Sequence, residues 1–583
     1  MKSSLSSAYR THPVHLFPWL TIETGHFALA QALLQAINQL PGPHILVIDG
    51  FIGLPWHDFI TRFRAALTDH VSEVRWLSTE TCLRPSHEIQ ALLESSLTQD
   101  PVFGRIFRGT LEEFWVPEQL AALQTRLATN AAEHLTIIYG FGASRVTTQG
   151  IHVYVDVPKD RCQQLAGQKA ICNIGAQEPE AFAAMYKRFY FVDWPMLNQI
   201  KRVEAARLDF FVDGTDAATP KLVHGTAFRR MLHELARRPF RVKPWFAPGP
   251  WGGQWMKEQF GLAPEQPNYA WSFELIAPEN GILLGNHEQD IECSFDFLLW
   301  AETDAVLGVS VAARYGSYFP IRFDYLDTME GTNLSCQVHP RLDYIRDHFG
   351  EPFTQDETYY IVSSEPGAQV YLGLRDDADL TQFYEDALAA RNHGVPFEIS
   401  DHVHSEFSRP HDLFLIPSGT VHCSGKNNLV LEISATPYIY TFKIYDYLRK
   451  DLSGHLRHVH LDHAFANIDA TRTATWVRSH LHAQPLLLRS EAGGSEYQIG
   501  NIPQLFFAIH RFEFTQQIAD RTNDKFQVLN LVEGERCEIL VEGAEPVEVR
   551  FAESVIIPAS VEAYRLRNLG ESACKVVKAF VKG

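Results

Sequence analysis

A chain of 583 residues is too long for a single hydrophobic core, so we expect two to four domains. Apolar residues make up 45% and charged residues 21%, as in a soluble globular protein, and a formal net charge of -19 argues against nucleic acid or an anionic membrane as the main partner. The eight cysteines include no C-x-x-C pair, the N-terminus has no apolar signal-peptide core, and no apolar run reaches the length of a membrane span. These features predict a reduced, cytoplasmic protein.

Residues 1–213 alternate apolar runs with segments of helical periodicity. The runs HILVID, HLTIIYG and IHVYVDVP are typical of buried strands, and HDFITRFRAAL, HEIQALLESSL and EQLAALQTRLA are typical of amphipathic helices. This alternation predicts a parallel sheet covered by helices. The stretch GTDAATPKLVHGT that follows is rich in turn formers, so residues 214–238 are interpreted as a linker.

The order of short phrases in this α/β domain resembles a P-loop kinase of the uridine-kinase type. A working P-loop requires G-x-x-x-x-G-K-[ST], whose backbone amides, lysine and hydroxyl hold phosphates and Mg²⁺. After Gly50 and Gly53 the chain continues Leu-Pro-Trp-His, without the lysine or the hydroxyl residue. We therefore expect a degenerate domain that serves assembly, substrate delivery or regulation. Further interpretations are that Asp49 and Asp156 are strand-end turn residues or remnants, and that Arg161 and Arg188 form surface salt bridges.

From about residue 239 the segments become short, β-rich and aromatic, with many Gly and Pro turns. A helical insertion, ADLTQFYEDALAARN, interrupts the first β-rich unit, which we place at residues 239–480, and a second unit follows at 481–583. Repeated short strands separated by turn signals predict barrels or sandwiches.

Four residues of the first β-rich unit have the pattern of a metal site. His422 ends a P-x-G-x-x-H sequence, in which Gly419 permits a tight turn that brings the histidine back into a barrel. Gln337 and His339 are two residues apart, so on a strand they face the same side, and Glu357 opens the next strand-like run. Two imidazoles, a carboxylate and an amide form a mixed site with room for water or substrate. Zinc is the first choice, although iron, manganese and cobalt also suit these ligands.

Together these residues closely resemble the zinc site of the class I mannose-6-phosphate isomerases of the cupin superfamily. The resemblance covers residues 239–583 and includes Pro250-Trp251-Gly252-Gly253, Trp271 with Glu274, Glu432, and the segment FKIYDY. It implies tandem cupin (jelly-roll) barrels that bind Zn²⁺. It also implies an aldose-ketose isomerase acting on a small sugar phosphate, most simply the conversion of mannose 6-phosphate to fructose 6-phosphate through a cis-enediol.

The resemblance implies catalytic roles for Glu432 and Lys443, but the chain also departs from the family. Glu432 is a candidate for a polar role in the site. The alternatives are that its side chain faces solvent or forms a structural ion pair. Lys443 stands where the family usually has an arginine, Gln355 where it often has a lysine, and Arg341 where it has an acidic residue. These changes leave two alternatives open. One is a catalytically altered protein that binds or senses a sugar or sugar phosphate, and the other is an isomerase of a different sugar, phosphorylated or unphosphorylated. The general base and the oligomeric state are not predicted.

The second β-rich unit repeats the motif without its histidine. In VIIPASVEAY, Pro558, Ser560 and Ala563 take the places of Pro417, Gly419 and His422. We therefore expect a metal-free barrel whose role is structural or is to shape the cleft.

Overall fold

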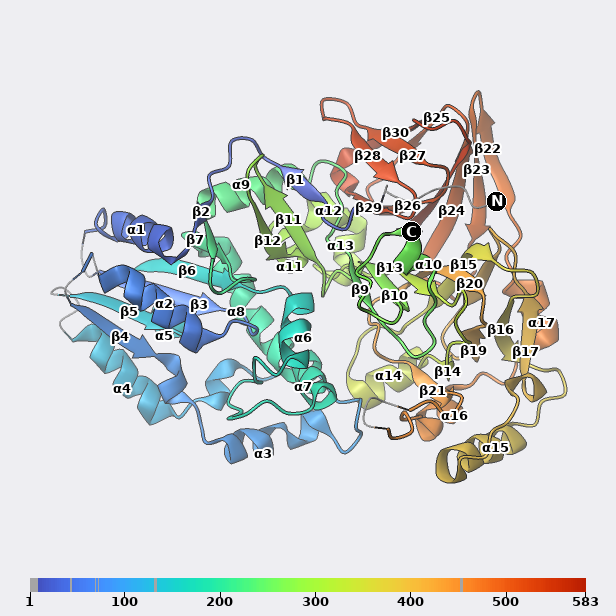
Figure 1. Ribbon diagram of the computed structural model, residues 1–583, viewed down its shortest axis with the longest axis horizontal. Coiled ribbons are helices and arrows are strands. Elements are labelled where there is room, and N and C mark those ends of the chain that lie inside the picture. Colours follow the sequence, from blue (N-terminus) through green and yellow to red (C-terminus); the bar gives the residue numbers. More distant parts are fainter. Residues whose placement is uncertain (1–8, 42–43, 69, 72, 130–133, 451–453) are drawn as a thin grey trace. The chain divides into compact units, whose positions relative to one another are not determined.

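The computed structural model describes residues 9–41, 44–68, 70–71, 73–129, 134–450 and 454–583 (Figure 1). The chain forms two compact units, and neither is one continuous stretch. The α/β unit comprises Pro13–Leu235 and Pro278–Glu302; the β unit comprises residues 9–12, Ala236–Ala277 and Thr303–Gly583. Among the described residues no helix is long and apolar enough to cross a membrane.

A seven-stranded sheet organises the α/β unit, in the order β2-β8-β7-β6-β3-β5-β4. The five strands from β3 to β7 are parallel, whereas β8 and β2 are antiparallel additions at one edge. Both β3 and β6 are buried along their whole length, as expected for strands covered on both faces. The strands are β2 (Glu23–Thr24), β3 (Ile45–Gly50), β4 (Val74–Ser78), β5 (Leu135–Tyr139), β6 (Ile151–Asp156), β7 (Phe210–Asp213) and β8 (Lys221–His224).

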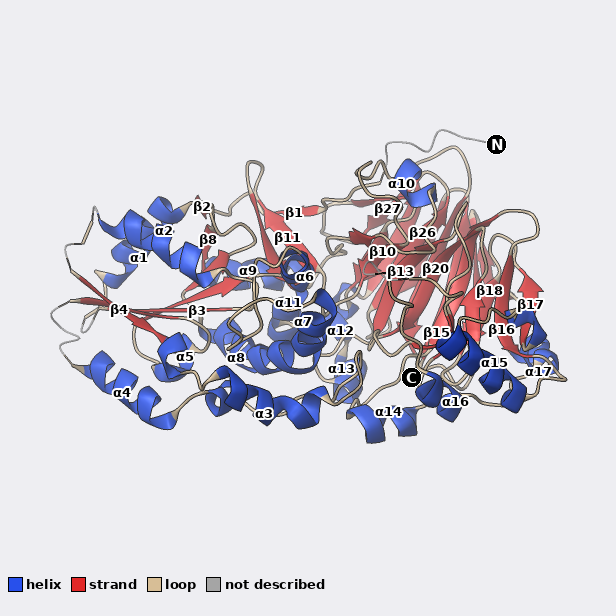
Figure 2. Ribbon diagram, turned by 60° about the horizontal axis from the view of Figure 1, so that its bottom comes forward, coloured by secondary structure: helices blue, strands red, loops and turns tan. Residues whose placement is uncertain are grey.

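Helices cover both faces of this sheet, with α1 and α2 on one side and α4 and α5 on the other (Figure 2). The expected parallel sheet with flanking helices is confirmed, while the kinase-like resemblance stays a prediction. The helices are α1 (His26–Ile37), α2 (Trp56–Thr68), α3 (Ser86–Leu97), α4 (Pro117–Ala128), α5 (Ala143–Val146), α6 (Lys159–Gly167), α7 (Phe182–Arg188), α8 (Trp194–Arg207), α9 (Gly225–Leu235) and α11 (Phe295–Ala301).

The loop between β3 and α2 is filled with apolar side chains. Phe51, Ile52 and Leu54 are buried, and Gly53 has φ +110° with no room for a Cβ, which would lie 2.8 Å from Val157. The preceding Asp49 is buried as well, and its carboxylate accepts hydrogen bonds from the backbone of Gly50, Gly142 and Ser144 and from the Ser144 hydroxyl. Asp49 is therefore a structural anchor between two loops.

A β-hairpin from between two strands of the β unit belongs to the α/β unit. Its strands β11 (Gly281–Gly285) and β12 (Asp290–Ser294) form a small sheet with β1 (Val14–Leu16). The Ser294 backbone and hydroxyl donate to Asp156, which also pairs with the buried Lys201 at 2.7 Å, and the backbone of Glu292 donates to Asp213. The strand-end carboxylates of β6 and β7 thus hold the hairpin.

Three expectations about this part of the chain need correction. Residues 278–302, expected within the metal-binding domain, pack with the α/β unit. The segment 214–238, expected as a linker, holds β8 and α9, because the turn formers stop at Pro220 and an amphipathic helix follows. Arg188 is buried beside Asp193 at 3.7 Å rather than exposed, and Arg161 bonds to the Thr215 carbonyl rather than to a carboxylate.

The β unit contains two barrels, each made of two facing sheets. The first has a six-stranded sheet, β18-β15-β20-β13-β10-β9, and a five-stranded sheet, β17-β16-β19-β14-β21. Its strands are β9 (Trp245–Ala247), β10 (Trp271–Leu275), β13 (Ile321–Asp327), β14 (Cys336–Val338), β15 (Glu357–Ser364), β16 (Gln369–Leu374), β17 (Val403–Phe407), β18 (Leu413–Ile416), β19 (His422–Ser424), β20 (Asn428–Ala435) and β21 (Phe442–Tyr445). Its helices are α10 (Trp255–Gln259), α12 (Thr303–Leu307), α13 (Val309–Tyr315), α14 (Leu342–Phe349), α15 (Leu380–His393), α16 (Leu461–Asn467) and α17 (Ala474–His480); α15 is the expected insertion.

The second barrel packs a six-stranded sheet, β22-β23-β24-β31-β26-β29, against a four-stranded sheet, β25-β30-β27-β28. An apolar core that includes Phe512, Leu529, Ile539 and Leu566 lies between them. The strands are β22 (Leu486–Glu491), β23 (Gly494–Gly500), β24 (Phe507–Phe514), β25 (Gln517–Arg521), β26 (Gln527–Glu533), β27 (Arg536–Leu540), β28 (Val547–Arg550), β29 (Ser554–Ile557), β30 (Ala563–Asn568) and β31 (Cys574–Val581). The two β-rich units expected from the sequence are therefore both present.

Candidate metal centre

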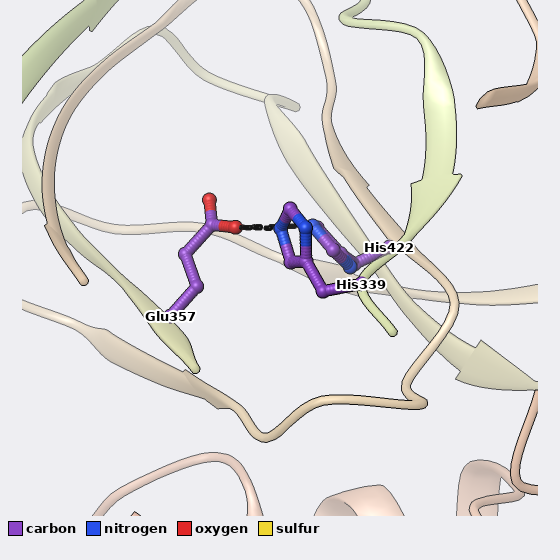
Figure 3. A group of neighbouring side chains, drawn as sticks. All are labelled: His339, Glu357 and His422. Atoms are coloured by element: carbon purple, nitrogen blue, oxygen red, sulfur yellow. Dashed lines mark hydrogen bonds and ion pairs between the residues drawn. The ribbon is translucent and has the colours of Figure 1, made fainter. Parts of the chain in front are cut away.

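Three potential metal ligands converge inside the first barrel (Figure 3). His339 follows β14 and His422 opens β19 in the five-stranded sheet, whereas Glu357 opens β15 in the facing sheet. One ligand atom from each residue lies within 4.8 Å of the other two, and all three side chains are at most 1% exposed. The Nε2 atom of His339 contacts the Glu357 carboxylate, and the Nε2 atom of His422 lies 3.4 Å from the same oxygen.

Backbone carbonyls fix the orientation and the tautomer of the two imidazoles. The Nδ1 atom of His339 is 3.0 Å from the Tyr440 carbonyl, and that of His422 is 2.9 Å from the Thr420 carbonyl. A carbonyl only accepts, so each Nδ1 carries the proton and each Nε2 keeps its lone pair for the centre. The two Nε2 lone pairs face one carboxylate oxygen. Such electron-rich atoms repel one another unless a cation or a proton lies between them. This donor set therefore fits a divalent metal ion.

Burial and mutual contact shift the pKa values of His339 and Glu357 toward their metal-binding forms. Burial lowers the pKa of His339, which favours the neutral imidazole that a metal requires. Burial alone would raise the pKa of Glu357, but the neighbouring imidazoles of His339 and His422 hold it well below its usual range. The carboxylate is thus ionised at neutral pH.

Gln337 joins the same group through strand register. It pairs with His422 across β14 and β19, and its amide nitrogen lies 3.2 Å from the Nε2 atom of His422. Cross-strand partners share a face, so the carboxamide is directed toward the centre. A half-turn about its last side-chain bond would direct the amide oxygen, which is the metal-binding atom, toward the same point.

The turn before His422 connects ligands that are far apart in sequence. Gly419 has φ +87°, a conformation that favours glycine, and its backbone N–H donates to the His339 carbonyl at 2.9 Å. The preceding Ser418 N–H donates to Asp356, the neighbour of Glu357, at 2.9 Å. The P-x-G segment therefore sets the spacing of the ligand-bearing strands as well as reversing the chain.

Glu432 lies inside the barrel in a buried ion pair. Arg322 on β13 contacts the Glu432 carboxylate, lies 3.1 Å from Asp324 and donates to the Ser434 hydroxyl at 2.7 Å. Burial raises the pKa of Glu432 to about 7, although Arg322 opposes this shift. At 5% exposure, Glu432 is not the solvent-facing residue that was one alternative.

Sequence reasoning missed Arg322. The only signal in the sequence is an arginine and an aspartate at alternate positions of the apolar strand IRFDYLD. Gln355, two residues before Glu357, reaches the same arginine. With its amide turned so that every group is paired, it accepts from Arg322 at 3.3 Å and donates to the Pro437 carbonyl at 3.2 Å.

Lys443 on β21 is the register partner of Gln337, so it lies on the sheet face that carries the ligands. Within the part of the chain that the structure describes, no hydrogen bond or ion pair engages its ammonium group. Burial lowers the pKa of Lys443 to about 8, and the charges of Arg457 and Arg449 act in the same direction while Asp446 opposes them.

Strand register relates the second barrel to the first. Glu357 pairs with the residue before Pro417, and Gln527 pairs with the residue before Pro558, so Gln527 corresponds to Glu357. Two residues further along the same strands, the partners are Glu432 in the first barrel and Lys578 in the second.

The side chain in the place of His422 is Tyr564, not Ala563. Its hydroxyl lies 2.6 Å from Gln527 Oε1 and 3.1 Å from Asp520, which pairs with the Lys578 ammonium at 2.7 Å, whereas Ala563 is exposed. The expected position is wrong by one residue, because a 3₁₀ turn and the left-handed Glu562 (φ 60°) lengthen the loop. A tyrosine hydroxyl and a lysine ammonium thus occupy the positions of a ligand and of Glu432.

Comparisons with known proteins give one family match and several sequence relatives. Residues 26–237 match a family described as a domain of unknown function (DUF8485). The protein "Mannose-6-phosphate isomerase" of Streptococcus mutans is 24% identical over 318 residues, which is 54% of this chain and 90% of the relative. "Mannose-6-phosphate isomerase ManA" of Bacillus subtilis is 23% identical over 341 residues, 58% of this chain and 98% of the relative.

Among solved structures, the mannose 6-phosphate isomerase from Bacillus subtilis is similar with a TM-score of 0.47 and 19% identity. The match covers 58% of this chain and 99% of that one. An H99Q mutant of the phosphomannose isomerase from Salmonella typhimurium gives a TM-score of 0.46 at 15% identity, over 59% of this chain and 99% of that one.

Proposed function

We propose that the chain is a zinc-dependent aldose-ketose isomerase of a small sugar phosphate, most simply of mannose 6-phosphate and fructose 6-phosphate. The observation that carries the proposal is the convergence of His339, His422 and Glu357, with both imidazole Nε2 atoms directed at one point. Sequence relatives that carry the name mannose-6-phosphate isomerase over more than half of the chain point to an isomerase.

Gln337, His339, Glu357 and His422 are the residues proposed to hold the metal. Bound there, a divalent ion would act as a Lewis acid on the oxygens at carbons 1 and 2 of the sugar. Isomerisation then needs a group that takes a proton from one carbon and returns it to the other. Glu432, whose pKa of about 7 suits proton transfer at neutral pH, is proposed for this step, with Arg322 holding its carboxylate in place.

Lys443 is proposed to bind the phosphate group of the substrate. Its ammonium lies on the ligand-bearing face beside Gln337, and no described residue engages it. A lysine provides charge without the planar fork of an arginine, so it would bind phosphate with less demanding geometry.

A second candidate, a protein that binds or senses a sugar phosphate without turning it over, draws on a different observation. The Glu432 carboxylate is already engaged by Arg322 and Ser434, which competes with proton transfer. A coupled assay of zinc-loaded protein with hexose and pentose phosphates and with free mannose separates the candidates. Turnover of mannose 6-phosphate supports the isomerase. No turnover of any sugar phosphate by protein with bound zinc rules it out, and calorimetric binding without turnover then favours the second candidate.

A further inference from the structure

A hollow lined by arginines lies on the outer face of the four-stranded sheet of the second barrel. The pocket has a volume of about 720 Å³, and Arg521 at the end of β25 and Arg565 on β30 lie along it. Both arginines are exposed, and so are Ala519 and Ala563, which lie on the same strands. Tyr564, which lies between Ala563 and Arg565 on β30, also lines the pocket, although its hydroxyl is bonded to Gln527 and Asp520.

The register of β25 and β30 places the two arginines diagonally. Arg521 pairs with Ala563, and Arg565 pairs with Ala519, so each guanidinium stands across from a methyl group. Diagonal neighbours on one sheet face are roughly 7 Å apart, which is within reach of long side chains, and like charges there repel. The alanines leave open space between the two cations, so a ligand can enter.

Neither guanidinium is neutralised by the protein. Within the described ranges no hydrogen bond or ion pair engages the guanidinium group of Arg521 or of Arg565; the Arg521 carbonyl accepts from the Gln527 amide at 2.9 Å. The pocket also contains two carboxylates and a third arginine. Asp520 is engaged by Lys578 at 2.7 Å, and Glu542 is exposed at the rim. Arg489 is bonded to Glu496 and to the Ala519 carbonyl, both at 2.6 Å.

We propose that this hollow is a binding site for a small phosphorylated metabolite, independent of the metal centre. Each free guanidinium group can donate two parallel hydrogen bonds, which matches the geometry of two phosphate oxygens. In a chain of net charge -19, two unpaired arginines facing one hollow raise the local concentration of an anion that the rest of the surface repels. The volume of the pocket has room for a sugar or nucleoside carrying one phosphate.

Calorimetric titration of the full chain with inorganic phosphate tests this site. We expect a dissociation constant of about 1 mM or below for the wild type, and affinity about tenfold or more weaker in Arg521→Ala and in Arg565→Ala. Arg567→Ala is the matched control and should bind as the wild type does. It removes another exposed arginine of β30, one that is already paired with Glu538.

Thermal unfolding provides an independent measurement with the same variants. Phosphate should raise the Tm of the wild type and of Arg567→Ala, but not of the Arg521→Ala Arg565→Ala double variant. Without phosphate, the double variant should melt no lower than the wild type, because it loses only unpaired like charges. An absence of phosphate binding to the wild type, or equal affinity in the double variant, overturns the proposal.

Discussion

Lys443 and Gln337 are direct cross-strand partners, so an ammonium group and a proposed metal ligand lie side by side on one face of the five-stranded sheet. Gln337 in turn pairs with His422 on its other side. The three side chains therefore form a row across β21, β14 and β19, from a free cation to the centre of the potential metal site. A substrate held at one end by its phosphate could present its reacting carbons at the other.

Lys443→Ala should raise the KM for mannose 6-phosphate by about tenfold or more, since a charge-assisted contact to phosphate would be lost. Free mannose makes no such contact, so its much weaker turnover should not change further. Steady-state kinetics with both sugars measure the difference. Lys426→Ala, which removes an exposed lysine from a turn of the same barrel, serves as the control and should match the wild type. Equal effects on both sugars would exclude a phosphate-binding role for Lys443.

Activity should fall on the alkaline side as Lys443 loses its proton. The pKa of this lysine is lowered to about 8, so the ammonium is present below that pH and is lost as the pH rises through it. We expect kcat/KM for mannose 6-phosphate to decline above about pH 8. In Lys443→Arg the guanidinium stays charged, so the decline should move to higher pH. An unchanged alkaline limb in this variant would assign the titration to another group.

Glu432→Gln should lower kcat by about 100-fold or more, with little change in KM, if Glu432 transfers the proton. The amide keeps the shape of the side chain, and Arg322 retains Asp324 at 3.1 Å, so the barrel should stay folded. Glu513→Gln, which removes a carboxylate paired with Arg511 in the second barrel, should leave kcat unchanged. A kcat within a factor of about three of the wild type would restrict Glu432 to a structural role.

Lys578→Met should destabilise the second barrel by about 2 kcal/mol, because Glu496 and Asp520 lose a charge-assisted partner and retain Arg489 as the cation between them. Hydrogen exchange of β24 and β31 reports this local loss of stability. Lys575→Met on the same strand breaks a more exposed pair with Glu533 and should cost less than about 1 kcal/mol. Similar exchange in both variants would show that Lys578 does not organise this core.

The sequence predicted those parts of the site that short-range rules govern. The position of His422 follows from the tight turn at Gly419, whose φ of +87° is a local property. Gln337 and His339 share a face because strands alternate. The pairing of Arg322 with Glu432 was not predictable, because it depends on two strands far apart in sequence becoming neighbours.

The remaining errors have the same origin. One extra residue in the 3₁₀ turn before Tyr564 moves Ala563 out of the barrel, and a motif aligned by sequence spacing does not register the change. In sequence, the hairpin of β11 and β12 is indistinguishable from the other β-rich segments. Its place in the α/β unit depends on hydrogen bonds to the strand-end carboxylates of Asp156 and Asp213. Local patterns determine the elements, whereas tertiary partners decide to which core an element belongs.

Metal content is the most direct test of the central claim that His339, Glu357 and His422 hold a divalent ion. Wild-type protein incubated with zinc and then dialysed should retain stoichiometric metal by mass spectrometry. His339→Ala and His422→Ala should retain little, and Gln337→Ala should bind more weakly. His411→Ala, whose imidazole pairs with Glu533 instead, should bind zinc as the wild type does. Equal zinc in wild type and His422→Ala, or none in the wild type, would contradict the proposed metal centre.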